Sequence, residues 1–222
     1  MKAKALTLNN NPSSSFSNFS TRIYVLILGI IAGLAGMAHG IFEISQGNKP
    51  TEDILVRIGA YTIISNYLLT GVISVVISFL ILVWIIGFIH KNNGPTIFML
   101  LLTILFFVGG GIAPIIGLLI TWAVATQINK PLAWWKKILP ENLRNQFAKR
   151  WLAFLITGIL FLLIGIGIWL IFTPPGENYR ITTVDYICWI FLGLGFLFQI
   201  LTIISGFARD IEKQHSISQV TQ

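Results

Sequence analysis

The stretch IFMLLLTILFFVGGGIAPIIGLLITW, residues 97–122, contains no charged residue and decides which class of fold the chain can adopt. Its 26 residues would extend ~39 Å as a helix, since each residue adds 1.5 Å. That length exceeds the ~30 Å hydrocarbon core of a bilayer. The stretch therefore predicts a transmembrane helix.

Four further segments of the chain have the same character, at about 23–45, 66–89, 151–172 and 186–207. Of the 222 residues, 55% are hydrophobic and only 10% are charged, and the mean hydropathy is +0.81. A backbone in lipid must satisfy its own hydrogen bonds, and the segments lack the alternation of barrel strands. The sequence predicts an all-α, polytopic membrane helix bundle with five transmembrane helices.

The remaining residues define the ends of the bundle and one patterned link. Residues 1–21 are polar and predict a disordered tail, residues 22–208 a single transmembrane domain, and residues 209–222 a cytoplasmic tail. Between the third and fourth spans, residues 131–150 combine Trp134 and Trp135 with Lys136 and Lys137. This pattern is typical of an interfacial amphipathic segment that faces lipid headgroups, with docking of a partner or a regulatory lipid as the alternative.

The distribution of basic residues predicts the orientation, because cytoplasmic links carry an excess of Lys and Arg. If the chain crosses five times, the N-terminal tail and the second and fourth links lie on one side of the membrane and contain Arg22, Lys91 and Arg180. The first and third links and the C-terminal tail lie on the other side and contain Lys49, Arg57, Lys130, Lys136, Lys137, Arg144, Lys149, Arg150, Arg209 and Lys213. We expect a plasma or inner membrane protein with its N-terminus outside and its C-terminus cytoplasmic. A rival interpretation, a cleaved signal peptide over residues 1–38, would export the most basic link.

His39 and Glu43 are unusual ionisable residues at the end of the first span. Because they are four residues apart, they share one helix face, together with Gly36 and Gly40. We expect this face to be buried near the inner interface, where Arg209 could serve as a partner. The pair is either structural or a proton-handling or ligand-binding site; no metal is expected, because two ligands are fewer than zinc generally takes.

The second and fifth spans also carry polar residues at helical spacing. Asn66, Thr70 and Ser74 recur every fourth residue in the second span, while Gln199 and Arg209 share a side of the fifth. Such rows should face protein or water, because polar groups in hydrocarbon need partners. They are either packing elements or the lining of a site.

The third span contains a cluster of helix-breaking residues. Its glycines allow close approach by a neighbouring helix, and its proline cannot donate to the carbonyl four residues earlier. The residues concerned are Gly109, Gly110, Gly111, Pro114 and Gly117. We expect a kink at this point, which serves either as a simple bend or as part of a gate.

The sequence lacks the usual signatures of catalysis. It contains no glycine-rich phosphate loop, no HExxH and no nucleophile with an evident base, so it predicts neither an enzyme nor a cofactor. The strings GMAHGIFEISQGN, GGGIAPIIGLL, INKPLAWWKKIL and GFARDIEKQ resemble an uncharacterised family of small multi-pass membrane proteins with no assigned activity.

Two functions remain open on this basis. One is a non-catalytic membrane subunit or interaction protein, and the other is a small transport or permeation protein that uses the polar residues. The expected partners are membrane lipids and a membrane protein or a second copy of the chain. Nucleic acid is not expected, because most basic residues flank the spans.

Overall fold

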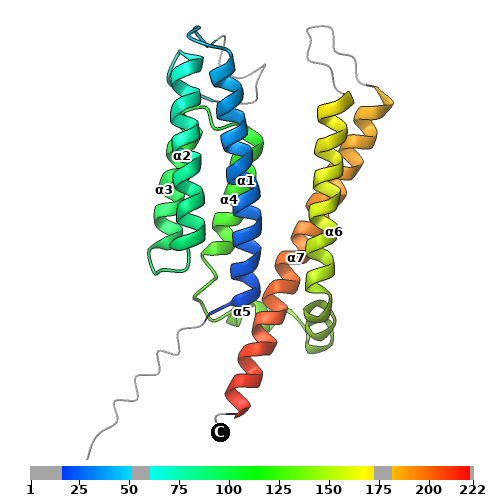
Figure 1. Cartoon of the computed structure of the whole chain (residues 1–222). Coiled ribbons are helices and arrows are strands. Elements are labelled where there is room, and N and C mark those ends of the chain that lie inside the picture. Colours follow the sequence, from blue (N-terminus) through cyan, green and yellow to red (C-terminus); the bar gives the residue numbers. More distant parts are fainter. Residues whose placement is uncertain (1–16, 52–60, 173–181, 221–222) are drawn as a thin grey trace, which may run out of the picture.

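The computed structural model describes residues 17–51, 61–172 and 182–220, which form seven helices (Figure 1). In chain order these are α1 (Phe19–Ser45), α2 (Tyr67–Gly87), α3 (Gly94–Phe107), α4 (Ile112–Ala125), α5 (Ala133–Ile138), α6 (Glu141–Phe172) and α7 (Thr183–Val220). The fold is all-α, as the composition predicts.

Within the described residues, four helices are long and apolar enough to cross a bilayer. They are α1, α2, Glu141–Trp169 within α6 and Thr183–Ser216 within α7. The chain is therefore a multi-pass membrane protein. The predicted count of five spans is not confirmed, because residues 97–122 contribute to two shorter apolar helices, α3 and α4, each of 14 residues.

The triple glycine separates α3 from α4. Gly109 and Gly111 adopt φ values of +89° and +76°, which side-chain-bearing residues rarely adopt. A Cβ on Gly110 would lie 2.3 Å from Leu105 Cγ, so no side chain fits there. Pro114 falls in the first turn of α4, where its missing N–H has no helical partner to lose. The chain therefore breaks at the glycines, and the expected kink at Pro114 within one continuous helix does not occur.

The two short helices form a hairpin that returns to the end of the bundle from which it started. The Asn129 side chain donates to the carbonyl of His90, which precedes α3, at 2.6 Å. At the other end, a short segment before α2 covers the turn of the hairpin. There the N–H of Ile63 donates to the carbonyl of Phe107 at 3.0 Å, and the ring of Tyr61 stacks on Phe106.

The hairpin places the start of α1 and the end of α7 at the same end of the molecule. The Asn18 N–H donates to the carbonyl of Ile128 at 2.9 Å, and the Asn18 side chain accepts from Gln214 at 2.6 Å. Five spans would place the N-terminus outside the membrane and the C-terminus in the cytoplasm. In the structure the start of α1 and the end of α7 lie at the same end of the bundle, because residues 97–122 enter and return as a hairpin and do not cross it once.

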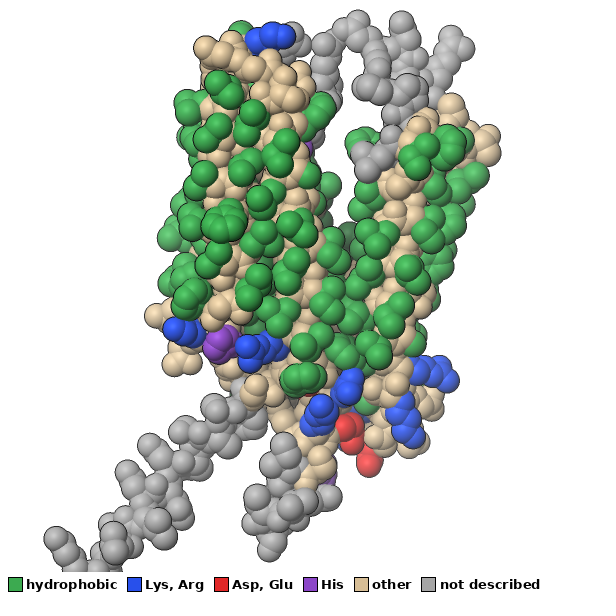
Figure 2. Space-filling model, viewed as in Figure 1, with side chains coloured by type: hydrophobic (Ala, Val, Ile, Leu, Met, Phe, Trp, Pro, Cys, Tyr) green, Lys and Arg blue, Asp and Glu red, His purple; other side chains and the backbone are tan. Residues whose placement is uncertain are grey.

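Basic residues gather at this end, which we call the basic end (Figure 2). It comprises the start of α1, the links 88–93 and 126–140, the first turns of α6 and the last turns of α7. The described Lys and Arg residues of these segments are Arg22, Lys91, Lys130, Lys136, Lys137, Arg144, Lys149, Arg150, Arg209 and Lys213. Of the described basic residues only Lys49 belongs to the opposite end, where its carbonyl accepts from the N–H of Tyr67.

Glycines of α1 bring α2 and α4 close to it. A Cβ on Gly40 would lie 2.9 Å from the carbonyl oxygen of Gly71 in α2, and one on Gly33 would meet Leu82 at 2.6 Å. The core beside this seam is apolar and closed, and Val25, Ile81, Ile85, Phe98, Leu105 and Leu118 are all 0% exposed. Such close packing is the main source of helix association in lipid.

The α6 and α7 helices form a second hairpin, which diverges from α1–α4 with distance from the basic end (Figure 1). In the first half of α7 the buried residues face α6: the Cys188 thiol donates to the Gly165 carbonyl, and a Cβ on Gly195 would touch Leu162. From Thr202 to Ile211, in contrast, most residues of α7 are buried. The hairpin is therefore supported by the rest of the chain mainly near the basic end.

Candidate functional site

His39 and Glu43 lie on the last turns of α1, at the end of the molecule opposite the basic end. The Glu43 carboxylate is almost completely buried, with 3% of its side chain exposed, and its Oε1 lies 3.5 Å from His39 Nε2. Neither His39 Nε2 nor Glu43 Oε2 has a hydrogen-bond partner among the residues that the structure describes. Burying a polar group without a partner is unfavourable, so the pair is a candidate for a functional site.

The triple glycine forms the wall against which the pair packs. A Cβ on Gly109 would lie 2.9 Å from Glu43 Oε1, and one on Gly111 would lie 3.1 Å from the Cγ of His39. The amino end of α4 follows directly at Ile112. The sequence suggested the pair and the glycines separately, and the structure brings them together.

The polar residues of α2 are engaged in packing. The buried Ser74 hydroxyl donates to the carbonyl of Val108 at 2.7 Å, which ties α2 to the hairpin turn. Thr70 is also buried, and its hydroxyl donates to the carbonyl of Tyr67 in its own helix. Asn66 is the N-cap of α2: its side chain accepts from the N–H of Leu69 and donates to Asn48. Asn66 therefore lies at the first end of α2, where the row of polar residues begins, and serves as the helix cap.

Gln199 and Arg209 are not part of this cluster. Gln199 is 5% exposed in the seam between α6 and α7, where its side-chain nitrogen would lie 2.9 Å from a Cβ on Gly158. Arg209 lies over the ring of Trp151 at the basic end. The expected proximity of Arg209 to Glu43 does not occur, because Asp210 contacts the start of α1, 23 residues or ~35 Å of helix from Glu43.

The structure brings together a group of polar residues at the basic end that no pattern in the sequence predicted as a cluster. We call it the clasp; it consists of Asn18, Ser20, Thr21, Asp210 and Gln214. Asp210 is 3% exposed and accepts from the N–H groups of Ser20 and Thr21, both at 2.8 Å, and from the Thr21 hydroxyl. The Asn18 side chain donates to the carbonyls of Gln127 and Lys130. These partners are more than 100 residues apart, so no local pattern predicts them.

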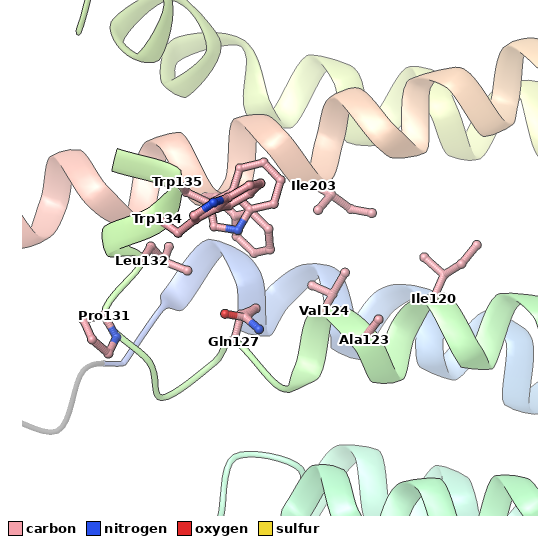
Figure 3. A pocket seen from close by; sticks show the side chains of 10 residues that line it. Ile120, Ala123, Val124, Gln127, Pro131, Leu132, Trp134, Trp135 and Ile203 are labelled. Atoms are coloured by element: carbon pink, nitrogen blue, oxygen red, sulfur yellow. The ribbon is translucent and has the colours of Figure 1, made fainter. Parts of the chain in front are cut away.

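The interfacial segment forms α5 and the start of α6, and it lines a groove of about 470 Å³ (Figure 3). Trp134 is 63% exposed, whereas Trp135 packs on Phe207 of α7 with ring centroids 4.8 Å apart. Val124 of α4 and Gln127 of the following link form the wall facing α7. The predicted lipid-facing residues Trp134, Lys136 and Lys137 are exposed at the basic end.

The chemical possibilities of these sites are limited. Within residues 17–51, 61–172 and 182–220, no group of three or more His, Cys, Asp or Glu side chains is placed to hold a metal ion. The His39/Glu43 cluster offers one imidazole and one carboxylate, and most of the side chains that line the groove at the basic end are apolar. No family model matches the chain, and no curated protein and no solved structure matches it either.

Proposed function

We propose that the chain is a non-catalytic membrane subunit that uses its α6–α7 hairpin to dock another membrane protein. The observation that carries this proposal is the isolation of the outer part of the hairpin. In the first half of α7 the buried Cys188 and Gly195 contact α6, and large apolar side chains such as Trp189, Ile190 and Leu197 are at least half exposed.

Two glycines on this hairpin support docking by a helix. Around Gly167 and Gly193, no described atom would lie within 4 Å of an added Cβ, so neither glycine is required by the packing of the hairpin. Small residues on the surface of a membrane helix allow another helix to approach closely. A helix of a partner, or of a second copy of the chain, would complete this surface.

The polar residues of α2 agree with a packing role. Ser74 bonds to a carbonyl of the α3–α4 turn, and the Ser78 hydroxyl lies against Gly36 of α1. A permeation path needs polar side chains that follow one another from one end of the bundle to the other. Asn66 and Thr70 instead bond at the helix terminus, within α2 and its neighbouring link.

Photo-crosslinking in the native membrane tests the proposal. A photoreactive amino acid at Leu197 should yield one discrete protein adduct, while one at Val76 on α2, which is equally exposed, should react with lipid only. Gly193→Leu should abolish the protein adduct, because it obstructs close approach. Gly87→Leu is the matched control, because Gly87 also has no described atom within 4 Å of an added Cβ. Lipid adducts alone at both positions would contradict the proposal.

The unsatisfied Glu43 supports a second candidate, a small transport protein that moves protons or cations. A carboxylate without a full set of partners, next to a break between two half-helices, is the arrangement that many transporters use. Purified protein in liposomes should then show proton or cation flux that Glu43→Gln reduces at least tenfold. If the wild type shows no flux above that of empty liposomes, this candidate fails and the docking function is unaffected.

We further propose that the chain lies in the plasma or inner membrane with its basic end in the cytoplasm. The support is the excess of Lys and Arg at that end, which is the usual determinant of orientation. Both described ends of the chain would then be cytoplasmic. His39, Glu43 and the triple glycine would lie near the outer surface, not at the inner interface as the five-span count implied.

A further inference from the structure

The groove at the basic end lies where α4, α5 and α7 meet. Its inner part is apolar and its outer part is edged by tryptophan and a side-chain amide (Figure 3). The residues that matter here are Ile120, Val124, Gln127, Trp134, Ile203 and Phe207. The walls come from segments about 80 residues apart in sequence, so the groove exists only in the folded chain.

We infer that this groove is a binding site for one anionic phospholipid, with an acyl chain between α4 and α7 and the phosphate at the lysines around α5. The apolar part runs from Trp134 toward Ile120 and Ile203, which follows the direction of a lipid chain from the headgroup level into the hydrocarbon. Tryptophan is enriched at that level because its ring is apolar and its N–H is polar.

The charges around the groove select the headgroup. Lys130, Lys136 and Lys137 are exposed, and none of them forms an ion pair in the described part of the chain. Of the carboxylates at the same end, Asp210 caps α1, Glu212 pairs with Arg144, and Glu141 at the start of α6 forms no ion pair with these lysines in the described part of the chain. The lysines are therefore an uncompensated positive group at the mouth of the groove, which is complementary to a phosphate.

A second, smaller groove extends the mouth on the other side of Leu132. It is lined by Lys136 and by Gln214 of α7, and its volume is about 310 Å³. A headgroup at α5 would thus contact both the α4–α5 link and the end of α7. This inference requires only that the basic end lies at a membrane surface, so it does not depend on the docking function proposed above.

Native mass spectrometry of the full chain released from nanodiscs tests the inference. The nanodiscs contain equal amounts of phosphatidylglycerol and phosphatidylcholine with identical acyl chains. We expect one phosphatidylglycerol to be retained per chain, with at least a tenfold preference over phosphatidylcholine. The double variant Lys136→Gln/Lys137→Gln should lower this preference about tenfold or more, because each lysine near an anionic surface contributes to the attraction.

Two further variants keep the test decisive. Ile203→Trp fills the groove and should abolish retention of both lipids while leaving the lysines intact. Lys149→Gln/Arg150→Gln removes the same charge from the basic end, but on α6, which contributes no residue to either groove, whereas Lys136 and Lys137 follow Trp135 on α5; it should change nothing. Equal loss in this control would show general surface attraction and overturn the inference. So would equal retention of the two lipids, no retained lipid, or a dimer that Ile203→Trp dissociates.

Discussion

The carboxylate of Asp210, near the end of α7, caps the amino end of α1, where it accepts a hydrogen bond from the N–H of Ser20 at 2.8 Å. The two residues are 190 positions apart. The first N–H groups of a helix have no partner within the helix, and a carboxylate satisfies them and complements the partial positive charge there. This contact links the α6–α7 hairpin to α1 at the basic end.

Asp210→Ala should therefore loosen the attachment of α7 to α1. It leaves the buried N–H groups of Ser20 and Thr21 without their acceptor, so we expect the free energy of unfolding in detergent to fall by about 3 kcal/mol. Asp185→Ala is the matched control, because among the described residues Asp185 accepts from Thr182 alone, three residues away. It should cost about 1 kcal/mol. A loss for Asp210→Ala no larger than that of the control would contradict this role.

The triple glycine should tolerate no side chain. Gly111→Ala combines a φ of +76° with a Cβ 3.1 Å from His39, and we expect it to lower the free energy of unfolding by about 2 kcal/mol. Gly47→Ala separates the two effects, because Gly47 has a φ of +78° but open space around an added Cβ. Thermal unfolding should place Gly47→Ala between Gly111→Ala and the neutral Gly87→Ala. Equal stability of all three variants would show that the turn is not constrained.

Ser74 and Ser78 offer a matched test of hydrogen bonding inside the bundle. Both are 0% exposed, but the Ser74 hydroxyl donates to the carbonyl of Val108, whereas the Ser78 hydroxyl has no partner in the described chain. Ser74→Ala should lower the free energy of unfolding by about 1 kcal/mol. Ser78→Ala should be neutral or stabilising, because it removes an unsatisfied polar group. The reverse order would be inconsistent with these contacts.

Cysteine labelling should establish the sides of the membrane. In a Cys188→Ser background, a membrane-impermeant maleimide should label Lys49→Cys in intact cells but should reach Lys91→Cys and Lys213→Cys only after permeabilisation. Lys91 and Lys213 belong to the same end when α3 and α4 form a returning hairpin. They would lie on opposite sides if residues 97–122 crossed the membrane once, so labelling of one without the other would refute the hairpin.

The sequence by itself determines that this chain is a bundle of membrane helices. Hydropathy and charge are local properties, and a window of ~20 uncharged residues is sufficient to identify a helix that can enter lipid. The same local reasoning predicts the interfacial segment, where Trp135 and Lys136 lie next to each other in sequence. The pairing of His39 with Glu43 also follows from helical spacing, and the structure places the two side chains together.

Only the tertiary structure decided whether residues 97–122 cross the bundle or return. Their length permits either outcome, and the choice depends on distant contacts: Glu43 and His39 against the glycines, Ser74 on Val108, and Ile63 on Phe107. One crossing more or less reverses the side of every later helix. For this reason the positions of Arg209 and of the clasp could not be read from the sequence, which assigned Ser20 and Asp210 to tails, whereas they lie in α1 and α7.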